Sequence, residues 1–109
     1  MDHHIDELTQ QLWNKKSAKL KYRRTIMDAW LGRCAYCHGI ADSLDHIRAK
    51  SLGGETSVRN LIPACMPCNR SKGSASLSEW FRHQVFYCPE REARIWEWQR
   101  QNSQPDIPT

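Results

Sequence analysis

The sequence lacks any apolar run as long as the roughly 18 residues that a membrane-spanning helix needs, so we expect no membrane span. Its first residues, 1–4, contain no basic segment followed by an apolar stretch, and we therefore expect no secretory signal. Apart from two similar cysteine pairs, the chain has no internal repeat and no low-complexity tract. These absences favour a single intracellular domain of 109 residues. Disulfides are not expected there, because intracellular thiols stay reduced.

Acidic residues are scarce in one part of the chain. Between positions 15 and 33 the only acidic residue is Asp28, whereas the basic residues are Lys15, Lys16, Lys19, Lys21, Arg23, Arg24 and Arg33. The formal net charge of the whole chain is +4. A basic block of this kind favours binding to phosphate backbones through counterion release. A solvated helix face would explain the charges equally well.

Helices are predicted at both ends of the chain. Apolar residues recur at helical spacing through residues 1–32, which predicts a helical basic arm that ends at Gly32. Ser76 and Glu79 fit a capping box, and Pro89 suits the first turn of a further helix. We therefore expect helices over residues 76–102 and a loose tail over residues 103–109. The apolar face expected after the capping box comprises Leu77, Trp80, Phe81 and Val85.

The middle of the chain, residues 33–75, is predicted to be mostly irregular. Residues 40–47 and 58–64 are candidate strands, and a short helix is expected from Asn69 until Gly73 ends it. The first cysteine pair reads as a tight knuckle in which Gly39 is free to adopt a positive φ.

Two Cys-x-x-Cys pairs are the strongest chemical signal. They are Cys34/Cys37 and Cys65/Cys68, with 27 residues between Cys37 and Cys65. Four thiolates complete a tetrahedral zinc shell, and a domain with a small core gains stability from such a metal, so the pattern predicts structural zinc. An iron–sulfur cluster uses the same ligands, but nothing in the sequence points to electron transfer. The fifth cysteine, Cys88, is expected to be a half-buried packing residue.

Four polar residues lie in or beside the segment that the cysteine pairs bracket: Asp45, His46, Asn60 and Asn69. A neutral imidazole can accept a proton from water, and a carboxylate can bind a hard divalent cation. Neighbouring side chains on a strand point to opposite faces, so Asp45 and His46 can serve one site only at a strand end or a distortion. Taken alone, each of the four is an unremarkable strand, turn or helix-start residue.

The combination is more specific than its parts. The segment from residue 34 to residue 72 reads Cys-x-x-Cys, Asp-His, Gly-Gly, Asn-Leu and Cys-x-x-Cys-Asn-Arg-x-Lys. It resembles the HNH endonucleases of the ββα-metal superfamily, in the four-cysteine zinc-stapled subgroup of small bacterial and phage type. The name-giving third histidine is Asn69 here, which makes the chain an HNN variant. An amide oxygen shifts metal preference toward magnesium or manganese.

The resemblance implies a fold and a role for each motif residue. The fold is α+β, with a small ββα-metal (His-Me finger) core over residues 33–75, stapled by a four-cysteine zinc site and flanked by N- and C-terminal helices. His46 is then the general base, Asp45 and Asn69 hold one catalytic cation, and Asn60 tethers the loop after His46. That cation is Mg²⁺ or Mn²⁺, and Ni²⁺ also serves this class. The cations nearest the site are Arg48, Lys50, Arg70 and Lys72, for which DNA binding and plain solvation are about equally plausible.

The activity implied is metal-dependent hydrolysis of phosphodiester bonds in double-stranded DNA, by nicking or by cutting both strands. The resemblance also permits a homodimer or a phage terminase-type partner, in the cytoplasm of a bacterium or of a phage-infected host cell. Two other functions stay open. One is a non-catalytic zinc-stapled nucleic-acid-binding module that uses the basic arm. The other is a nuclease accessory subunit that acts only within a phage packaging complex.

Overall fold

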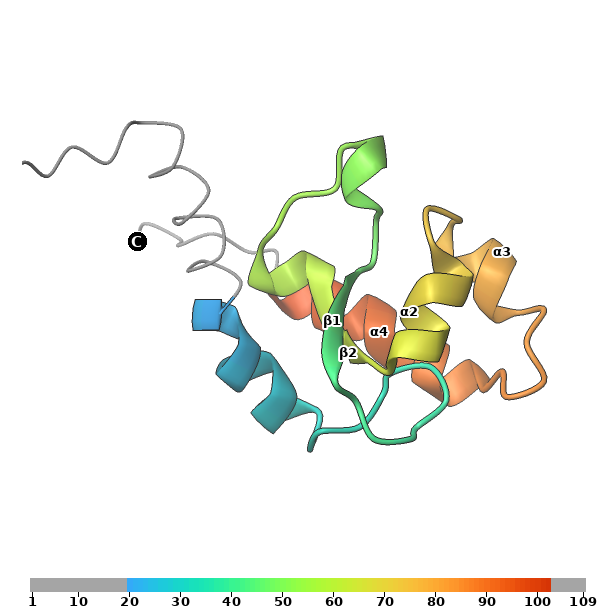
Figure 1. Ribbon diagram of the computed structural model, residues 1–109, viewed down its shortest axis with the longest axis horizontal. Helices are drawn as coiled ribbons and strands as arrows, with labels where there is room; N and C mark the ends of the chain where they lie inside the picture. Colours follow the sequence, from blue (N-terminus) through green and yellow to red (C-terminus); the bar gives the residue numbers. More distant parts are fainter. Residues whose placement is uncertain (1–19, 103–109) are drawn as a thin grey trace, which may run out of the picture.

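The computed structural model describes residues 20–102 (Figure 1). The predicted tail at residues 103–109 and the first nineteen residues of the predicted basic arm lie outside the described part. Residues 20–29 are helical, and the chain leaves this helix through Leu31 and Gly32, both at positive φ (56° and 70°). The helix therefore ends three residues before the predicted stop at Gly32.

The sheet is a two-stranded antiparallel hairpin of β1 (Ser43–His46) and β2 (Leu61–Ala64). Asp45 pairs with Ile62 and His46 pairs with Leu61, so both motif residues lie at the end of β1 that leads into the connecting loop. That loop contains two short 3₁₀ helices, η1 (Lys50–Leu52) and η2 (Val58–Asn60).

Both strands are shorter than the sequence predicts. Ile40 forms only an isolated bridge with Arg33, and residues 58–60 are 3₁₀ helix and not strand. The second difference has a visible cause: the backbone carbonyl of Asn60 accepts from Ile47 N at 2.8 Å, while its side chain binds the loop. These bonds hold the chain in a bend before β2 begins.

A short helix, α2 (Met66–Lys72), follows β2 directly and packs on β1. Pro67 lies in its first turn, and Gly73 ends it at φ 51°. It starts before the predicted Asn69, with Cys65 as its N-cap and Cys68 in its first turn. The strands β1 and β2 and the helix α2 form the ββα unit, and the predicted α+β fold class is confirmed.

Two further helices complete the domain: α3 (Leu77–Phe81) and α4 (Pro89–Gln101). The predicted capping box is present, since Ser76 Oγ accepts from Glu79 N at 3.2 Å. The predicted apolar face wrongly included Val85, because α3 ends at Phe81 and leaves Val85 fully exposed. The helix α4 crosses behind the hairpin in Figure 1, where Trp98 Nε1 donates to Leu61 O at 3.1 Å.

The core lies between the ββα unit, the C-terminal helices and the N-terminal helix, which contributes Ile26. Tyr36, from the first cysteine knuckle, makes edge-on ring contacts with Trp80 (4.9 Å between centroids) and Phe81 (5.5 Å). Glu92 joins α4 to α3, because its buried carboxylate accepts hydrogen bonds from Ser78 and Arg82. No helix in the described part of the chain is long and apolar enough to cross a membrane.

Candidate functional site

The four predicted cysteines converge on one point. The Sγ atoms of Cys34, Cys37, Cys65 and Cys68 all lie within 4.8 Å of one another, and those of Cys37 and Cys65 are 3.7 Å apart. A tetrahedral zinc ion with Zn–S bonds of about 2.3 Å places its sulfur ligands about 3.8 Å apart. The cluster is therefore positioned to bind a metal ion, and its size and donors are consistent with structural zinc.

The first knuckle reaches this geometry through a tight turn. Cys34 N donates to Gly39 O at 2.7 Å, and His38 N donates to Cys34 O at 2.9 Å. The positive φ predicted for Gly39 falls instead on His38 (69°). Gly39 has another constraint: its N–H points at Cys37 Sγ (3.4 Å), and an added Cβ would lie 3.4 Å from the same sulfur.

Burial and hydrogen bonding set the acidity of these thiols. Burial raises the pKa of Cys34 and of Cys68. The pKa of Cys37 is lowered: burial, its largest single influence, raises it, but hydrogen bonds from Gly39 N–H and the neighbouring thiols outweigh burial. A metal ion therefore has to displace protons from at least the two buried thiols, which couples metal binding to pH. The fifth cysteine, Cys88, is half-buried at the start of α4, with its thiol 3.3 Å from Glu90 Oε1.

Asp45 is buried between the knuckle and α2. Tyr36 Oη donates to Asp45 Oδ2 at 2.5 Å, and Lys72 Nζ lies 3.6 Å from the same oxygen. Burial raises the pKa of Asp45, while Lys72 and the Tyr36 hydroxyl lower it in part. Both side-chain contacts use Oδ2, so the other carboxylate oxygen, Oδ1, makes neither of them.

Lys72 differs from the surface cation that the sequence suggested. Its side chain is buried beneath the hairpin, where Nζ also donates to His46 O at 2.9 Å. Arg48, Lys50 and Arg70 are exposed, as residues that grip DNA would have to be. Lys72 therefore joins Asp45 to the main chain of His46.

His46 is the last residue of β1, as the predicted sharing of one site with Asp45 requires. Its Nε2 lies 3.0 Å from Thr56 Oγ1, in the connecting loop. No motif in the sequence marks Thr56. Tyr36 was equally hard to identify as a partner of Asp45, because it appears only as a spacer between two cysteines.

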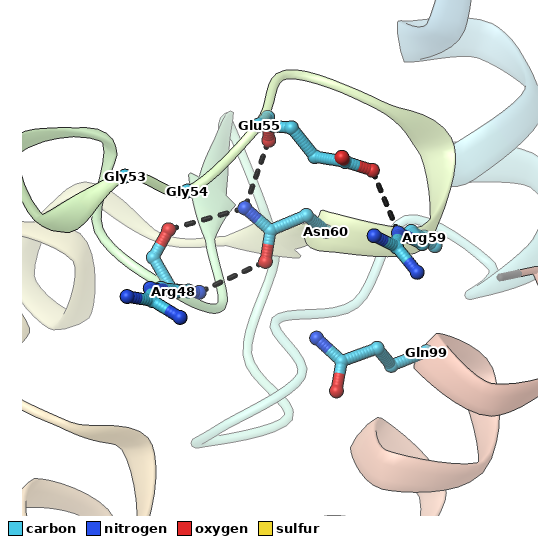
Figure 2. Close-up of a pocket in the computed structure, with 7 residues that line it drawn as sticks. All are labelled: Arg48, Gly53, Gly54, Glu55, Arg59, Asn60 and Gln99. Carbon is cyan, nitrogen blue, oxygen red and sulfur yellow. Dashed lines mark hydrogen bonds and ion pairs between the residues drawn. The ribbon is translucent and has the colours of Figure 1, made fainter.

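Asn60 is buried and fastens the loop that follows His46 (Figure 2). Its Oδ1 accepts from Arg48 N at 2.9 Å, and its Nδ2 donates to Arg48 O at 3.1 Å and to Glu55 O at 2.8 Å. One amide thus binds both main-chain groups of Arg48. These are hydrogen bonds of the kind that the predicted tether requires.

Asn69 projects from α2 onto β1. Its Nδ2 donates to Ser43 Oγ at 3.1 Å and to Leu44 O at 3.2 Å, the two residues before Asp45. A carbonyl oxygen can only accept, so the contact with Leu44 fixes which end of the amide faces the strand. The amide oxygen faces away from these partners and is the atom that could bind a cation.

Comparison with known proteins agrees with this arrangement. Residues 33–75 match the family model described as HNH endonuclease. Over 121 aligned positions the chain is 29% identical to the "SPbeta prophage-derived putative HNH endonuclease YoqL" of Bacillus subtilis (strain 168). The alignment covers 83% of this chain and 53% of that relative, so the chain spans about half the length of the relative. No solved structure matches the chain significantly.

The matched segment contains both cysteine pairs, the hairpin and α2, which are the parts that build the site. Over residues 33–75, the chain is similar to the HNH endonuclease family.

Proposed function

We propose that the protein is a metal-dependent DNA endonuclease in which His46 is the general base and Asp45 and Asn69 hold one divalent cation. The similarity of residues 33–75 to HNH endonucleases supports a nuclease acting on DNA. The observation that carries the finer assignment is the way Asp45 and Asn69 are held. The side-chain hydrogen bonds described above hold Oδ2 of Asp45 and Nδ2 of Asn69, and the other end of each head group, Oδ1, is the atom proposed to bind the cation.

The residues present fit such a cation. One carboxylate oxygen and one amide oxygen are hard donors, which suit Mg²⁺ or Mn²⁺ better than softer metals. The buried ammonium of Lys72 lies 3.6 Å from Asp45 Oδ2 and thereby restrains the carboxylate without using Oδ1. A cation bound there would stabilise the negative charge that develops on the phosphodiester during hydrolysis.

Contacts to the main chain of His46 and of the two residues after it fix its position for proton transfer. Lys72 binds its carbonyl, and Asn60 binds the main chain of Ile47 and Arg48, the next two residues. If Nε2–H donates to Thr56, the neutral ring carries its lone pair on Nδ1, which accepts the proton of the attacking water. Water oxygen then bonds to phosphorus and the 3′ oxygen leaves, so the products carry 5′-phosphate and 3′-hydroxyl ends.

The exposed cations Arg48, Lys50 and Arg70 are the groups proposed to hold the DNA backbone near this site. A single active site cleaves one strand, so a double-strand break requires two nicks or two copies of the chain. The homodimer and the terminase-type partner both remain predictions.

The test is cleavage of supercoiled plasmid in the presence of Mg²⁺ or Mn²⁺, comparing wild type with His46→Ala and with His83→Ala. His83 is an exposed histidine outside the matched segment and serves as the matched control. We expect wild type and His83→Ala to convert the plasmid to nicked or linear forms, and His46→Ala to bind it without cleavage. A chelator control excludes a contaminating metal-independent nuclease.

Full activity of His46→Ala would refute the general-base assignment. Failure of every variant to cleave, with plasmid still retarded on a gel, would favour the non-catalytic binding module or a nuclease that needs a partner. Asn69→His tests the cation site separately: it should retain cleavage and broaden the range of metals accepted, because imidazole is the better ligand for softer ions.

A further inference from the structure

A polar recess of about 290 Å³ lies beside the Asn60 tether, between the connecting loop and α4 (Figure 2). The side chains that line it include two arginines, Arg48 and Arg59, and the amide of Gln99. Arg48 and Arg59 come from the two ends of the loop, and Gln99 reaches it from α4, far away in the sequence. The fold therefore gathers two guanidinium groups and an amide at one place, two residues from the proposed general base.

Each of the two guanidinium groups uses only some of its nitrogen atoms in hydrogen bonds within the protein. Arg48 Nε donates to Leu52 O at 2.9 Å, and Arg59 Nε donates to Glu55 Oε2 at 2.6 Å. Within residues 20–102, the hydrogen bonds of these two side chains run through Nε, so the terminal nitrogens are left for another acceptor. A guanidinium held by Nε loses less side-chain entropy when its outer nitrogens bind an anion.

The recess also contains one acidic group, Glu55, and its charge is already matched. Its carboxylate accepts from Arg59 and from Ser57 Oγ (2.7 Å), and the bond to Arg59 lowers the pKa of Glu55, so it stays ionised. One carboxylate against two guanidinium groups leaves the recess with an excess positive charge. The amide of Gln99, for which the described residues provide no hydrogen-bond partner, adds a neutral donor.

Two glycines allow the loop to close over this recess. Gly53 has φ 90°, and a Cβ on Gly54 would lie 1.8 Å from Arg48 O. The same carbonyl accepts from Asn60 Nδ2 at 3.1 Å. The loop, the tether and the recess therefore depend on one close main-chain contact, which fixes the position of Arg48 relative to His46.

We propose that this recess binds a phosphate group of the DNA backbone next to the scissile one, with Arg48, Arg59 and Gln99 as its donors. The proposal rests on the proposed DNA-cleaving function and adds Arg59 and Gln99 to its substrate-binding residues. A phosphate is the expected ligand because forked guanidinium groups match its oxygens in shape and charge. The contact reads no bases, so it should strengthen binding to all sequences equally.

The experiment measures the dissociation constant of a short fluorescein-labelled DNA duplex against salt concentration. All variants are made in the His46→Ala background, so that binding is read without cleavage. We expect Arg59→Gln to weaken binding about tenfold and to reduce the slope of log K against log salt by about 1. Gln99→Glu should weaken binding, whereas Gln99→Lys should tighten it and steepen the slope by up to about 1.

The matched control is Arg100→Gln, which removes a positive charge from α4 one residue beyond Gln99 but outside the recess. It should change affinity less than about twofold, because an exposed cation away from the contact is screened by salt. A second duplex of unrelated sequence should give the same ratios. Sodium phosphate alone, at constant ionic strength, should compete weakly, and strong competition would identify free phosphate as the ligand and overturn the proposal.

The outcomes separate this proposal from the proposed function. If Arg59→Gln and both Gln99 variants behave like Arg100→Gln, the recess does not bind DNA, whether or not the wild type cleaves plasmid. If the slopes change as expected but the wild type does not cleave, the recess is supported and the nuclease assignment fails. The tighter binding expected of Gln99→Lys is decisive, since a misfolded loop cannot produce it.

Discussion

The buried pair of Lys72 and Asp45 makes the sharpest prediction about stability. Replacing Lys72 by methionine keeps most of the side-chain volume but removes the ammonium group. That group lies 3.6 Å from Asp45 Oδ2 and donates to His46 O. In the variant, Tyr36 remains to bind the carboxylate, and the backbone carbonyl of His46 loses its donor.

The burial of this ion pair sets the size of the expected loss in the free energy of unfolding. The side chains of Lys72 and Asp45 are 0% and 7% exposed, so water cannot replace the lost partner. Removing one member of a buried ion pair costs about 3–5 kcal/mol, because it leaves an uncompensated charge in a poorly solvated place. A domain of this kind has a total stability of only about 5–15 kcal/mol. Lys72→Met should therefore lose a large part of the free energy of unfolding.

The assay is urea denaturation of zinc-loaded protein without added magnesium. The control is Arg24→Met, which breaks the ion pair between Arg24 and Asp28 (3.9 Å; side chains 92% and 76% exposed) and should cost at most about 0.5 kcal/mol. The double variant Lys72→Met/Asp45→Asn should be less destabilised than the sum of its single variants, by about 2 kcal/mol or more. If Lys72→Met costs no more than Arg24→Met, the pair does not contribute as described.

Three further predictions concern the zinc cluster, the loop and α4. Cys65→Ser should lose bound zinc and several kcal/mol of stability, whereas Cys88→Ser should lose neither; a cooperatively folded, zinc-free Cys65→Ser would contradict this. Gly54→Ala should cost about 1–3 kcal/mol in thermal unfolding, because its Cβ would overlap Arg48 O, and wild-type stability would show that the loop relaxes freely. Hydrogen bonds from Arg82, Tyr87, Trp96 and Ser78 overcome burial and lower the pKa of Glu92 to about 2 from its usual 4.5. The stability that this carboxylate contributes is thus present above pH 4.5 and lost as the pH falls toward 2. Glu92→Gln should cost about 2–3 kcal/mol at neutral pH, and its difference from wild type should shrink over that range in denaturation curves; a constant difference would refute the assignment.

The parts of the fold that the sequence predicted are those with local signals. A Cys-x-x-Cys pair positions two thiols within one turn, and the capping box at Ser76 and the proline at Pro89 mark helix starts with groups only a few residues apart. Two such pairs can be expected to share one ion without knowledge of the path between them. The four-cysteine cluster was predictable for this reason.

The parts that were not predicted depend on contacts across the chain. Nothing local distinguishes Lys72 from a surface lysine, and its burial follows only from the packing of α2 against β1. The start of the second strand was misplaced because Asn60 binds Arg48, which no period in the sequence reveals. Val85 was assigned to an apolar face that would have required α3 to continue past Phe81.

Asn60 connects the two halves of the proposed substrate site, and this affects how its variants should be understood. Its amide binds both main-chain groups of Arg48, whose backbone continues from His46 and whose side chain lines the recess. Loss of that amide would therefore loosen the proposed general base and the proposed phosphate contact together. Removal of Arg59 would affect the contact alone, because Arg59 bonds only to Glu55 among the residues that the structure describes. Asn60→Ala should accordingly lower kcat and raise KM, whereas Arg59→Gln should raise KM and leave kcat unchanged. Equal effects of the two substitutions on kcat would mean that the recess takes part in the chemistry itself and not only in holding DNA.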